Sequence, residues 1–206
     1  MLPSFPPAPY ALFETWHRAA EEHEHIRYAG AMCLSTVAAD GGPDGRIVLL
    51  HAADAGRGFA FFTDVRSAKG RALADDPRVA LTFYWGPLER QVRVQGRAAL
   101  SSEAEADRFF EKRPRRSRLT AWASEQSRPL SEDVAAAAAL EEQMAALRER
   151  FAGRASIPRP PHWKAYRVRP RRVAFWEAKA QRLHTRVEYA RDADAASGWT
   201  KRRLAP

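Results

Sequence analysis

The sequence is poor in cysteine, since Cys33 is the only one among 206 residues. A single thiol cannot close a disulfide within the chain, so a disulfide-stapled fold is excluded and a reducing, cytoplasmic location is expected. The longest apolar run, residues 134–140, is rich in alanine and far shorter than the roughly 20 residues that a membrane span requires. No basic stretch followed by an apolar one begins the sequence, so we expect neither a secretory signal nor a membrane partner.

The common catalytic motifs are also missing. The sequence contains no HExxH, no paired cysteines, no Walker loop, no GxSxG and no GxGxxG. Its six histidines are scattered along the chain, so no metal site is expected. No single motif therefore names a reaction.

Acidic residues are fewer than basic ones. The chain has 25 Asp and Glu against 34 Lys and Arg, which gives a formal net charge of +9. Such a field favours anionic partners, and both nucleic acid and a phosphorylated small molecule or cofactor fit that description. The arginines cluster at residues 113–118 and 167–172, with a smaller basic group at 201–203, and a short cluster of this kind is commonly just a solvated surface.

The clearest pattern that is present is a β-hairpin at residues 79–99. Apolar residues alternate from Val79 to Trp85, and the alternation resumes after Gly86-Pro87 at Val92. Strands are also expected at residues 32–38, 46–52, 59–63, 163–170, 173–178, 182–190 and 199–204. The pattern predicts a β-rich α+β fold in which antiparallel strands form a barrel or a strongly curled sheet.

Helices are expected at residues 10–28, 102–112, 119–125 and 131–151, with a short one between Ser67 and Pro77. Ser67 is the predicted N-cap of the short helix, and Ser102 with Glu105 forms a predicted capping box. A helix start offers unpaired N–H groups, so Lys69 there could bind phosphate, although a solvated lysine is commoner. The longest helix carries an apolar stripe that we expect to form core or a subunit contact, made of Val134, Leu140, Met144, Leu147 and Phe151.

One polar group stands out near the carboxyl terminus. Arg182, His184 and Arg186 alternate, so on an extended strand all three would project from the same face. Three cationic or titratable side chains on one face repel one another unless an anion lies between them. An anion site and a solvated edge strand are equally consistent with the pattern.

A series of motifs in fixed order resembles the pyridoxamine 5'-phosphate oxidase family, whose members use FMN, and its relative in phenazine biosynthesis. The resemblance covers about Ala31 to the carboxyl terminus. The matching motifs are RIVLL (46–50), FFT (61–63), SAKG (67–70), LERQVRVQG (88–96), RPRRS (113–117), EQS (125–127), FW (175–176), RLHTR (182–186) and RRLAP (202–206).

The resemblance implies an FMN-binding split β-barrel of antiparallel strands with surrounding helices, assembled as a homodimer with FMN in a cleft between subunits. Residues 1–206 would form one domain, in which residues 1–30 are an arm and helix and residues 163–206 complete the active site and the dimer interface. The residues implied to hold FMN, several of them from the partner chain, are Arg46, Ile47, Val48, Leu49, Phe62, Thr63, Lys69, Gln91, Gln126, Ser127, Trp176 and Arg186.

The resemblance also implies a reaction, in which pyridoxamine or pyridoxine 5'-phosphate loses a hydride from its C4' carbon to the flavin. Molecular oxygen would then reoxidise the flavin and form hydrogen peroxide. The catalytic residues implied are Arg182 and His184, over the pyridine ring. The substrate-binding residues implied are His51, Phe109, Arg113, Ser117, Arg182 and His184.

The chain departs from the family around the substrate phosphate. His51 stands where the vitamin enzyme has a lysine, and Phe109 stands where it has a tyrosine. Each lost charge-assisted bond contributes roughly 1.5–3 kcal/mol. Arg115, Arg116 or a protonated His51 would have to replace the lost lysine and tyrosine at the substrate phosphate. At the cofactor, Ala68 replaces the arginine of the family's SRK, and HDR becomes HTR at residues 184–186.

These departures keep an alternative open, namely an FMN-dependent oxidase that acts on another ring compound, as the phenazine-pathway relative does. A third hypothesis is a non-catalytic protein whose arginines bind nucleic acid, which predicts salt-sensitive binding without a yellow cofactor. The set of flavin-site residues argues against the third hypothesis. We therefore expect a small-molecule partner, a phosphorylated pyridine ring, and no nucleic acid.

Overall fold

The computed structural model describes residues 5–129 and 135–206. Its helices are α1 (Pro9–Glu21), α2 (Ala68–Asp75), α3 (Glu103–Glu111), α4 (Arg115–Ala123) and α5 (Ala135–Arg150), with short 3-10 turns at Gly86–Leu88 and Ala180–Arg182. Its strands are β1 (Ala31–Val37), β2 (Pro43–Leu49), β3 (Ala52–Asp54), β4 (Gly58–Asp64), β5 (Arg78–Trp85), β6 (Arg90–Leu100), β7 (Trp163–Glu177), β8 (Thr185–Arg191) and β9 (Trp199–Arg203).

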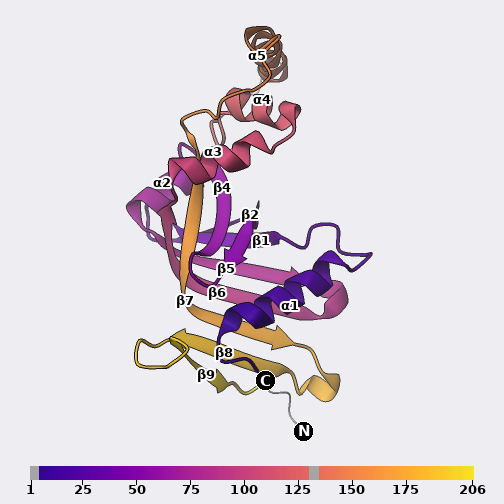
Figure 1. Ribbon diagram of the computed structural model, residues 1–206, viewed down its shortest axis with the longest axis vertical. Coiled ribbons are helices and arrows are strands. Elements are labelled where there is room, and N and C mark those ends of the chain that lie inside the picture. Colours follow the sequence, from indigo (N-terminus) through magenta and orange to yellow (C-terminus); the bar gives the residue numbers. More distant parts are fainter. Residues whose placement is uncertain (1–4, 130–134) are drawn as a thin grey trace.

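The strands form one antiparallel sheet in the order β2-β1-β5-β6-β7-β4-β3, to which β8 and β9 are added beyond the carboxyl-terminal half of β7 (Figure 1). The predicted hairpin is confirmed as β5 and β6, in which Val79 lies opposite Gly96 and Phe83 opposite Val92. The α+β class and the antiparallel strands predicted from the sequence are therefore confirmed.

Strand β7 organises the sheet because it has different neighbours along its length. Its first half pairs with β4, its second half pairs with β8, and β6 pairs with nearly all of it. The sequence predicted two strands here, interrupted after Pro170, and that prediction is wrong. Pro170 has no N–H to donate, but it lies at a register shift beside Gly96, where the ladder is already irregular and the strand can continue.

The main core fills the space that the curled sheet encloses. Leu34, Phe61, Leu81, Phe83 and Val94, from four strands of the sheet, are almost completely buried. Helix α1 adds aromatic side chains to this core. The Phe13 ring meets Phe59 and Phe83 edge-on, at centroid distances of 5.0 and 5.1 Å, and Trp16 meets Phe175 at 5.2 Å.

Two predicted helices have other bounds. Helix α1 ends at Glu21 rather than at residue 28, because Ala20 is the last of its buried residues and the EEHEH stretch that follows offers no apolar side chain to bury. Helix α4 spans Arg115–Ala123 rather than 119–125, and Pro114 is its N-cap residue.

Helices α4 and α5 lie at one end of the molecule and form a second, smaller core (Figure 1). Met144 and Phe151 from the predicted apolar stripe pack there with Leu119 and Ile157. Val134 and the side chain of Leu140 lie outside the described residues. In the part of the chain that the structure describes, no helix is long and apolar enough to cross a membrane.

Candidate functional site

A hollow of about 710 Å³ opens between β2, the end of β4, the start of α2 and the segment 124–128, and we call it the β2–α2 hollow. Most of the cofactor and substrate residues predicted from the sequence line it, namely Arg46, Ile47, Val48, Leu49, His51, Phe62, Thr63, Lys69, Phe109, Arg113, Gln126 and Ser127. Asp44, Leu50 and Trp163 also line it and were not predicted. Its volume is typical of small-molecule sites, which span roughly 300–1,000 Å³.

Lys69 lies in the first turn of α2, where the Ser67 Oγ caps the helix by accepting the Gly70 N–H at 3.2 Å. The Lys69 ammonium donates to Gln126 Oε1 at 2.8 Å and to Ser67 Oγ at 3.4 Å, and the residue is only 7% exposed. Burial lowers the pKa of Lys69, and the neighbouring Arg46 lowers it further. A bound anion would relieve both effects, because it favours the charged form of the lysine.

Arg46 comes from β2 and is held from two sides. One guanidinium nitrogen, Nη1, donates to Thr36 Oγ1 at 2.8 Å and to the Leu34 carbonyl at 3.2 Å. The other terminal nitrogen pairs with Asp44, two residues earlier on the same strand. The i, i+2 spacing in a strand places both side chains on one face, which is the signal that could have found Asp44.

The segment after α4 closes one side of the hollow. Gln126 Oε1 accepts a second hydrogen bond, from Thr63 Oγ1 at 3.0 Å, so one amide oxygen ties this segment to β4 and to α2. Ser127 follows with a φ of +69°, in the left-handed region that non-glycine residues rarely adopt. Strained backbone of this kind is found preferentially at ligand sites.

Aromatic rings form another wall. The Phe62 ring stacks parallel to Phe109 at 4.2 Å and to Trp163 at 4.7 Å, with interplanar angles of 8° and 6°. The His51 ring lies 3.6 Å from Phe109, measured between centroids. This wall suits a flat, unsaturated ring.

Two of the side chains expected to replace the family's lysine and tyrosine at the substrate phosphate do not supply a free positive charge near this aromatic wall. Partial burial among these rings lowers the pKa of His51, which disfavours a protonated His51 as the cation that replaces the family lysine. Arg115 is also engaged elsewhere, since it donates to the Phe151 carbonyl at 2.6 Å and the Arg154 carbonyl at 3.0 Å. Neither side chain is therefore well suited to bind the substrate phosphate in place of the family's lysine.

Arg113 is the cation that faces this wall. Its guanidinium carbon lies 5.0 Å above the Trp163 ring, and burial lowers the pKa of the arginine. Its Nη1 is buried and has no hydrogen-bond partner among the described residues. A buried donor without a partner is costly, so a hydrogen-bond acceptor beside this nitrogen would be favourable.

A second set of predicted residues lies elsewhere in the chain. Gln91, Trp176 and Arg186 sit opposite one another on β6, β7 and β8 and share one face of the sheet. The His184 ring lies 4.9 Å from Trp176, between centroids. None of these residues lines the β2–α2 hollow, and neither do Arg182 and Ser117.

The prediction that Arg182, His184 and Arg186 alternate on one strand is wrong. Strand β8 begins at Thr185, and Arg182 ends a short 3-10 turn with a φ of +61°. The Lys179 N–H donates to His184 Nδ1 at 3.3 Å within this turn. The sequence pattern missed the turn because it contains neither glycine nor proline.

Residues 19–144 match the family model described as pyridoxamine 5'-phosphate oxidase, and residues 163–206 match the model described as pyridoxine 5'-phosphate oxidase C-terminal dimerisation region. The chain belongs to the pyridoxamine 5'-phosphate oxidase family. Within this family it is an FMN-dependent oxidoreductase with the split-barrel fold. The resemblance described from the sequence motifs is thus confirmed.

Named relatives are similar over almost the whole chain. The pyridoxine/pyridoxamine 5'-phosphate oxidase of Burkholderia cenocepacia (strain HI2424) is 47% identical over 200 residues, covering 97% of this chain and 90% of the relative. The protein of the same name from Burkholderia mallei (strain SAVP1) is 48% identical over 200 residues, with the same coverage.

Two solved structures share the fold. PhzG from Burkholderia lata 383, in complex with tetrahydrophenazine-1-carboxylic acid, has a TM-score of 0.84 and 30% identity, covering 98% of this chain and 94% of that one. A pyridoxamine 5'-phosphate oxidase-related, FMN binding protein from Nostoc punctiforme PCC 73102 has a TM-score of 0.72 and 20% identity, covering 99% and 100%. The second comparison bears on the fold alone.

The β2–α2 hollow fits the FMN of this oxidase family. FMN carries a phosphate and a flat three-ring system. Lys69 and Arg46 are neighbouring cations that line the hollow, and apolar side chains of β2 and β4 line it as well, namely Ile47, Val48, Leu49 and Phe62. The donor set therefore matches the two chemically distinct parts of the cofactor.

Proposed function

We propose that this protein oxidises pyridoxamine or pyridoxine 5'-phosphate to pyridoxal 5'-phosphate with molecular oxygen as the electron acceptor. FMN, when bound at this site, would supply the redox chemistry, with hydride from the C4' carbon as the electron source and with molecular oxygen, two electrons and two protons ending as hydrogen peroxide. For pyridoxamine 5'-phosphate, water would then hydrolyse the resulting imine to the aldehyde and release ammonia. The names of relatives that are 47–48% identical support this substrate. The single cysteine supports a cytoplasmic location.

The observation that carries the proposal is the unpartnered Nη1 of Arg113 beside the aromatic wall of the hollow. A buried guanidinium that lacks a carboxylate partner needs an anion, and the adjacent flat wall needs a ring. A pyridine ring with a phosphate substituent supplies both. Ser117, in the first turn of α4, does not line the hollow, so its role at the phosphate stays a prediction from the resemblance.

The cofactor roles follow from the same geometry. Lys69 and Arg46 would bind the FMN phosphate, because they line the hollow beside the start of α2, whereas Arg66 and Arg71 do not line it. Gln126 and Ser127 would close over the cofactor from the segment 124–128. The residues that would border the flavin ring from β2 and β4 are Ile47, Val48, Leu49, Phe62 and Thr63.

We also propose that the active site is completed by a second copy of the chain. Gln91, Trp176 and Arg186 lie outside the hollow of their own protomer, and two of them lie in the segment that matches the dimerisation region. In a homodimer this row would reach the partner's FMN, and Arg182 and His184 would lie over the substrate ring. Arg182 and His184 would orient the substrate there and exclude water.

A second candidate substrate is a ring compound with a carboxylate in place of the phosphate. The pKa of His51 is lowered and Phe109 has no hydroxyl, so Arg113 is left to face the ligand's charged group. One guanidinium pairs well with one carboxylate. PhzG, with 30% identity, was solved with a ring carboxylic acid. A non-catalytic nucleic-acid-binding role is not proposed, since the chain belongs to an enzyme family.

Steady-state peroxide formation in air distinguishes these candidates. The purified holoenzyme is supplied with pyridoxamine 5'-phosphate, with pyridoxamine, or with a dihydroaromatic ring carboxylate. The proposal predicts the highest kcat/KM for the phosphorylated substrate, with pyridoxamine far slower. A ring carboxylate that is oxidised much faster than pyridoxamine 5'-phosphate would replace the first proposal with the second.

A further inference from the structure

Arg66 lies two residues after the end of β4, in the turn that leads to Lys69. Its guanidinium forms a two-pronged pair with Asp64, with Nε at 3.1 Å from Oδ1 and Nη2 at 2.8 Å from Oδ2. The Arg66 backbone N–H donates to the same carboxylate at 2.7 Å. Asp64 is only 6% exposed, whereas half of the Arg66 side chain remains exposed. The arginine is therefore fixed in orientation by a buried carboxylate.

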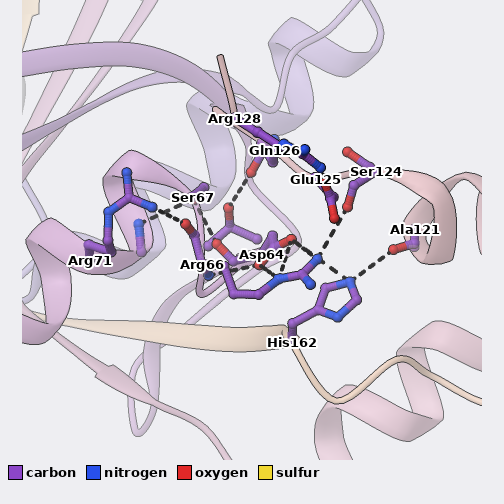
Figure 2. Close-up of polar contacts among 12 residues, drawn as sticks. Asp64, Arg66, Ser67, Arg71, Ala121, Ser124, Glu125, Gln126, Arg128 and His162 are labelled. Atoms are coloured by element: carbon purple, nitrogen blue, oxygen red, sulfur yellow. Dashed lines mark hydrogen bonds and ion pairs between the residues drawn. The ribbon is translucent and has the colours of Figure 1, made fainter. Parts of the chain in front are cut away.

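The fixed guanidinium also reaches across to another part of the chain. Arg66 Nη2 donates to the Ser124 carbonyl at 3.3 Å, just after α4 (Figure 2). His162 makes a parallel contact, since its Nε2 lies 3.1 Å from the Ala121 carbonyl and 3.8 Å from Asp64 Oδ2. The Asp64 carboxylate thus sits between two side chains that hold the end of α4 and the residues after it.

The segment 124–128 depends on these contacts for its position. Among the described residues, its side-chain hydrogen bonds to β4, the turn after it and α2 come from Arg66 to the Ser124 carbonyl and from Thr63 and Lys69 to Gln126. Its own ion pair, between Glu125 and Arg128, is internal to the segment. Fixing Ser124 therefore limits how far Gln126 can move from the Lys69 ammonium.

Arg66 does not line the β2–α2 hollow, so it is not a ligand that takes over from the arginine missing at Ala68. We propose that Arg66 is a positioning residue for FMN: with Asp64 it holds the segment 124–128 against β4, so that Gln126 keeps Lys69 directed into the hollow. This inference rests on the cofactor site proposed above. It assigns to Arg66 a geometric role, which requires the planar guanidinium, rather than a purely electrostatic one.

The test measures FMN release from the purified holoenzyme after dilution, followed by flavin fluorescence. Arg66→Ala should speed release about fivefold, which corresponds to about 1 kcal/mol. Arg66→Lys should release FMN almost as fast as Arg66→Ala. An ammonium keeps the charge, but it cannot bind Asp64 in two places and reach the Ser124 carbonyl as well. Arg128→Ala is the matched control, since it removes an exposed arginine from the same segment and should leave release unchanged.

A double-mutant comparison separates positioning from a general loss of stability. If Arg66 acts through Gln126, then adding Arg66→Ala to Gln126→Ala should change FMN release little beyond Gln126→Ala alone. Amide hydrogen exchange should become faster at residues 124–129 in Arg66→Ala and stay unchanged in β5 and β6. Because Arg66→Ala leaves Asp64 buried without its partner, Asp64→Asn with Arg66→Ala provides a second variant, and it should show the same faster release.

Several results would overturn the inference. These are wild-type FMN release from Arg66→Ala, full recovery in Arg66→Lys, or effects of Arg66→Ala and Gln126→Ala that simply add. The Lys69→Met variant distinguishes failure of this inference from failure of the proposed cofactor site. If Lys69→Met speeds release while Arg66→Ala does not, only the positioning role is wrong. If neither variant has an effect, the cofactor site itself is wrongly placed.

Discussion

At the scale of single residues, Lys69 is the side chain on which the cofactor site most depends. It is buried, capped into the first turn of α2 and held by Gln126, and its pKa is lowered by burial. Lys69→Met keeps the length and removes the charge. We expect FMN affinity to fall by about 10- to 100-fold, as loss of a charge-assisted bond of roughly 1.5–3 kcal/mol predicts.

Titration of the apoprotein with FMN measures this change. Lys164→Met is a suitable control, because Lys164 pairs with Glu103 and does not line the hollow. Equal affinity in Lys69→Met and the wild type would contradict the assignment of the phosphate site.

His51 and Phe109 offer a second prediction at this scale. Their rings lie 3.6 Å apart and line the hollow, but Phe109 carries no charge and the lowered pKa of His51 disfavours its protonated form. His51→Lys combined with Phe109→Tyr adds a cation and a hydroxyl. We expect KM for pyridoxamine 5'-phosphate to fall about tenfold or more, since two polar contacts are gained. KM for unphosphorylated pyridoxamine is the internal control, and an equal change for both compounds would show that the new groups do not face a phosphate.

At the scale of elements, helix α2 depends on Gly70. A Cβ at this position would lie 2.3 Å from the Val65 carbonyl oxygen, which is backbone and cannot swing away. Gly70→Ala should therefore displace the helix start, lower the free energy of unfolding by about 1–3 kcal/mol, and weaken FMN binding through Lys69.

Denaturant unfolding checks the effect on α2. Gly86→Ala is the matched control, because the nearest atom to its Cβ would be a Tyr84 ring carbon at 3.5 Å, an ordinary contact. A Gly70→Ala protein as stable as the wild type would mean that α2 can shift without cost.

The elements also show which features the sequence could predict. The β5–β6 hairpin and the Ser67 cap were predictable because each is set by local chemistry, namely alternating burial around Gly86-Pro87 and a hydroxyl one residue before the helix. The continuity of β7 through Pro170 was not, since it depends on the irregular pairing opposite Gly96. The turn at Arg182 was missed because residues 180–182 contain neither glycine nor proline.

Less of the candidate site could be predicted from local sequence patterns. Periodicity alone gave Lys69 only a weak phosphate role, and the association of Arg46 with Gln126 came from the resemblance to the family. Trp163 was missed because its stacking on Phe62 depends on how the chain folds. Asp44 was missed because the predicted strand began at residue 46, whereas β2 begins at Pro43 and places Asp44 on the same face as Arg46. The single-chain sequence likewise could not show that the row at Gln91 lies apart from the hollow.

At the scale of the whole molecule, the site residues fall into two sets that one protomer does not bring together. The hollow contains Lys69, and the row on β6–β8 contains Arg186. If two copies share each site, Lys69→Met and Arg186→Ala should complement each other in mixed dimers. Random mixing restores about a quarter of the sites, because half of the dimers are mixed and each of these holds one intact site.

Coexpression of differently tagged chains, followed by activity per bound FMN, measures this recovery. Each variant alone provides the baseline. Activity in the mixture that equals the average of the two variants would place both sets in a site within one chain.

The most direct test of the account as a whole is anaerobic mixing of the holoenzyme with pyridoxamine 5'-phosphate while the visible flavin spectrum is recorded. The account predicts loss of the flavin absorbance with formation of one pyridoxal 5'-phosphate per FMN, and return of the spectrum with hydrogen peroxide when air is admitted. A flavin spectrum that this substrate leaves unchanged, while a ring carboxylate bleaches it, would contradict the proposed substrate.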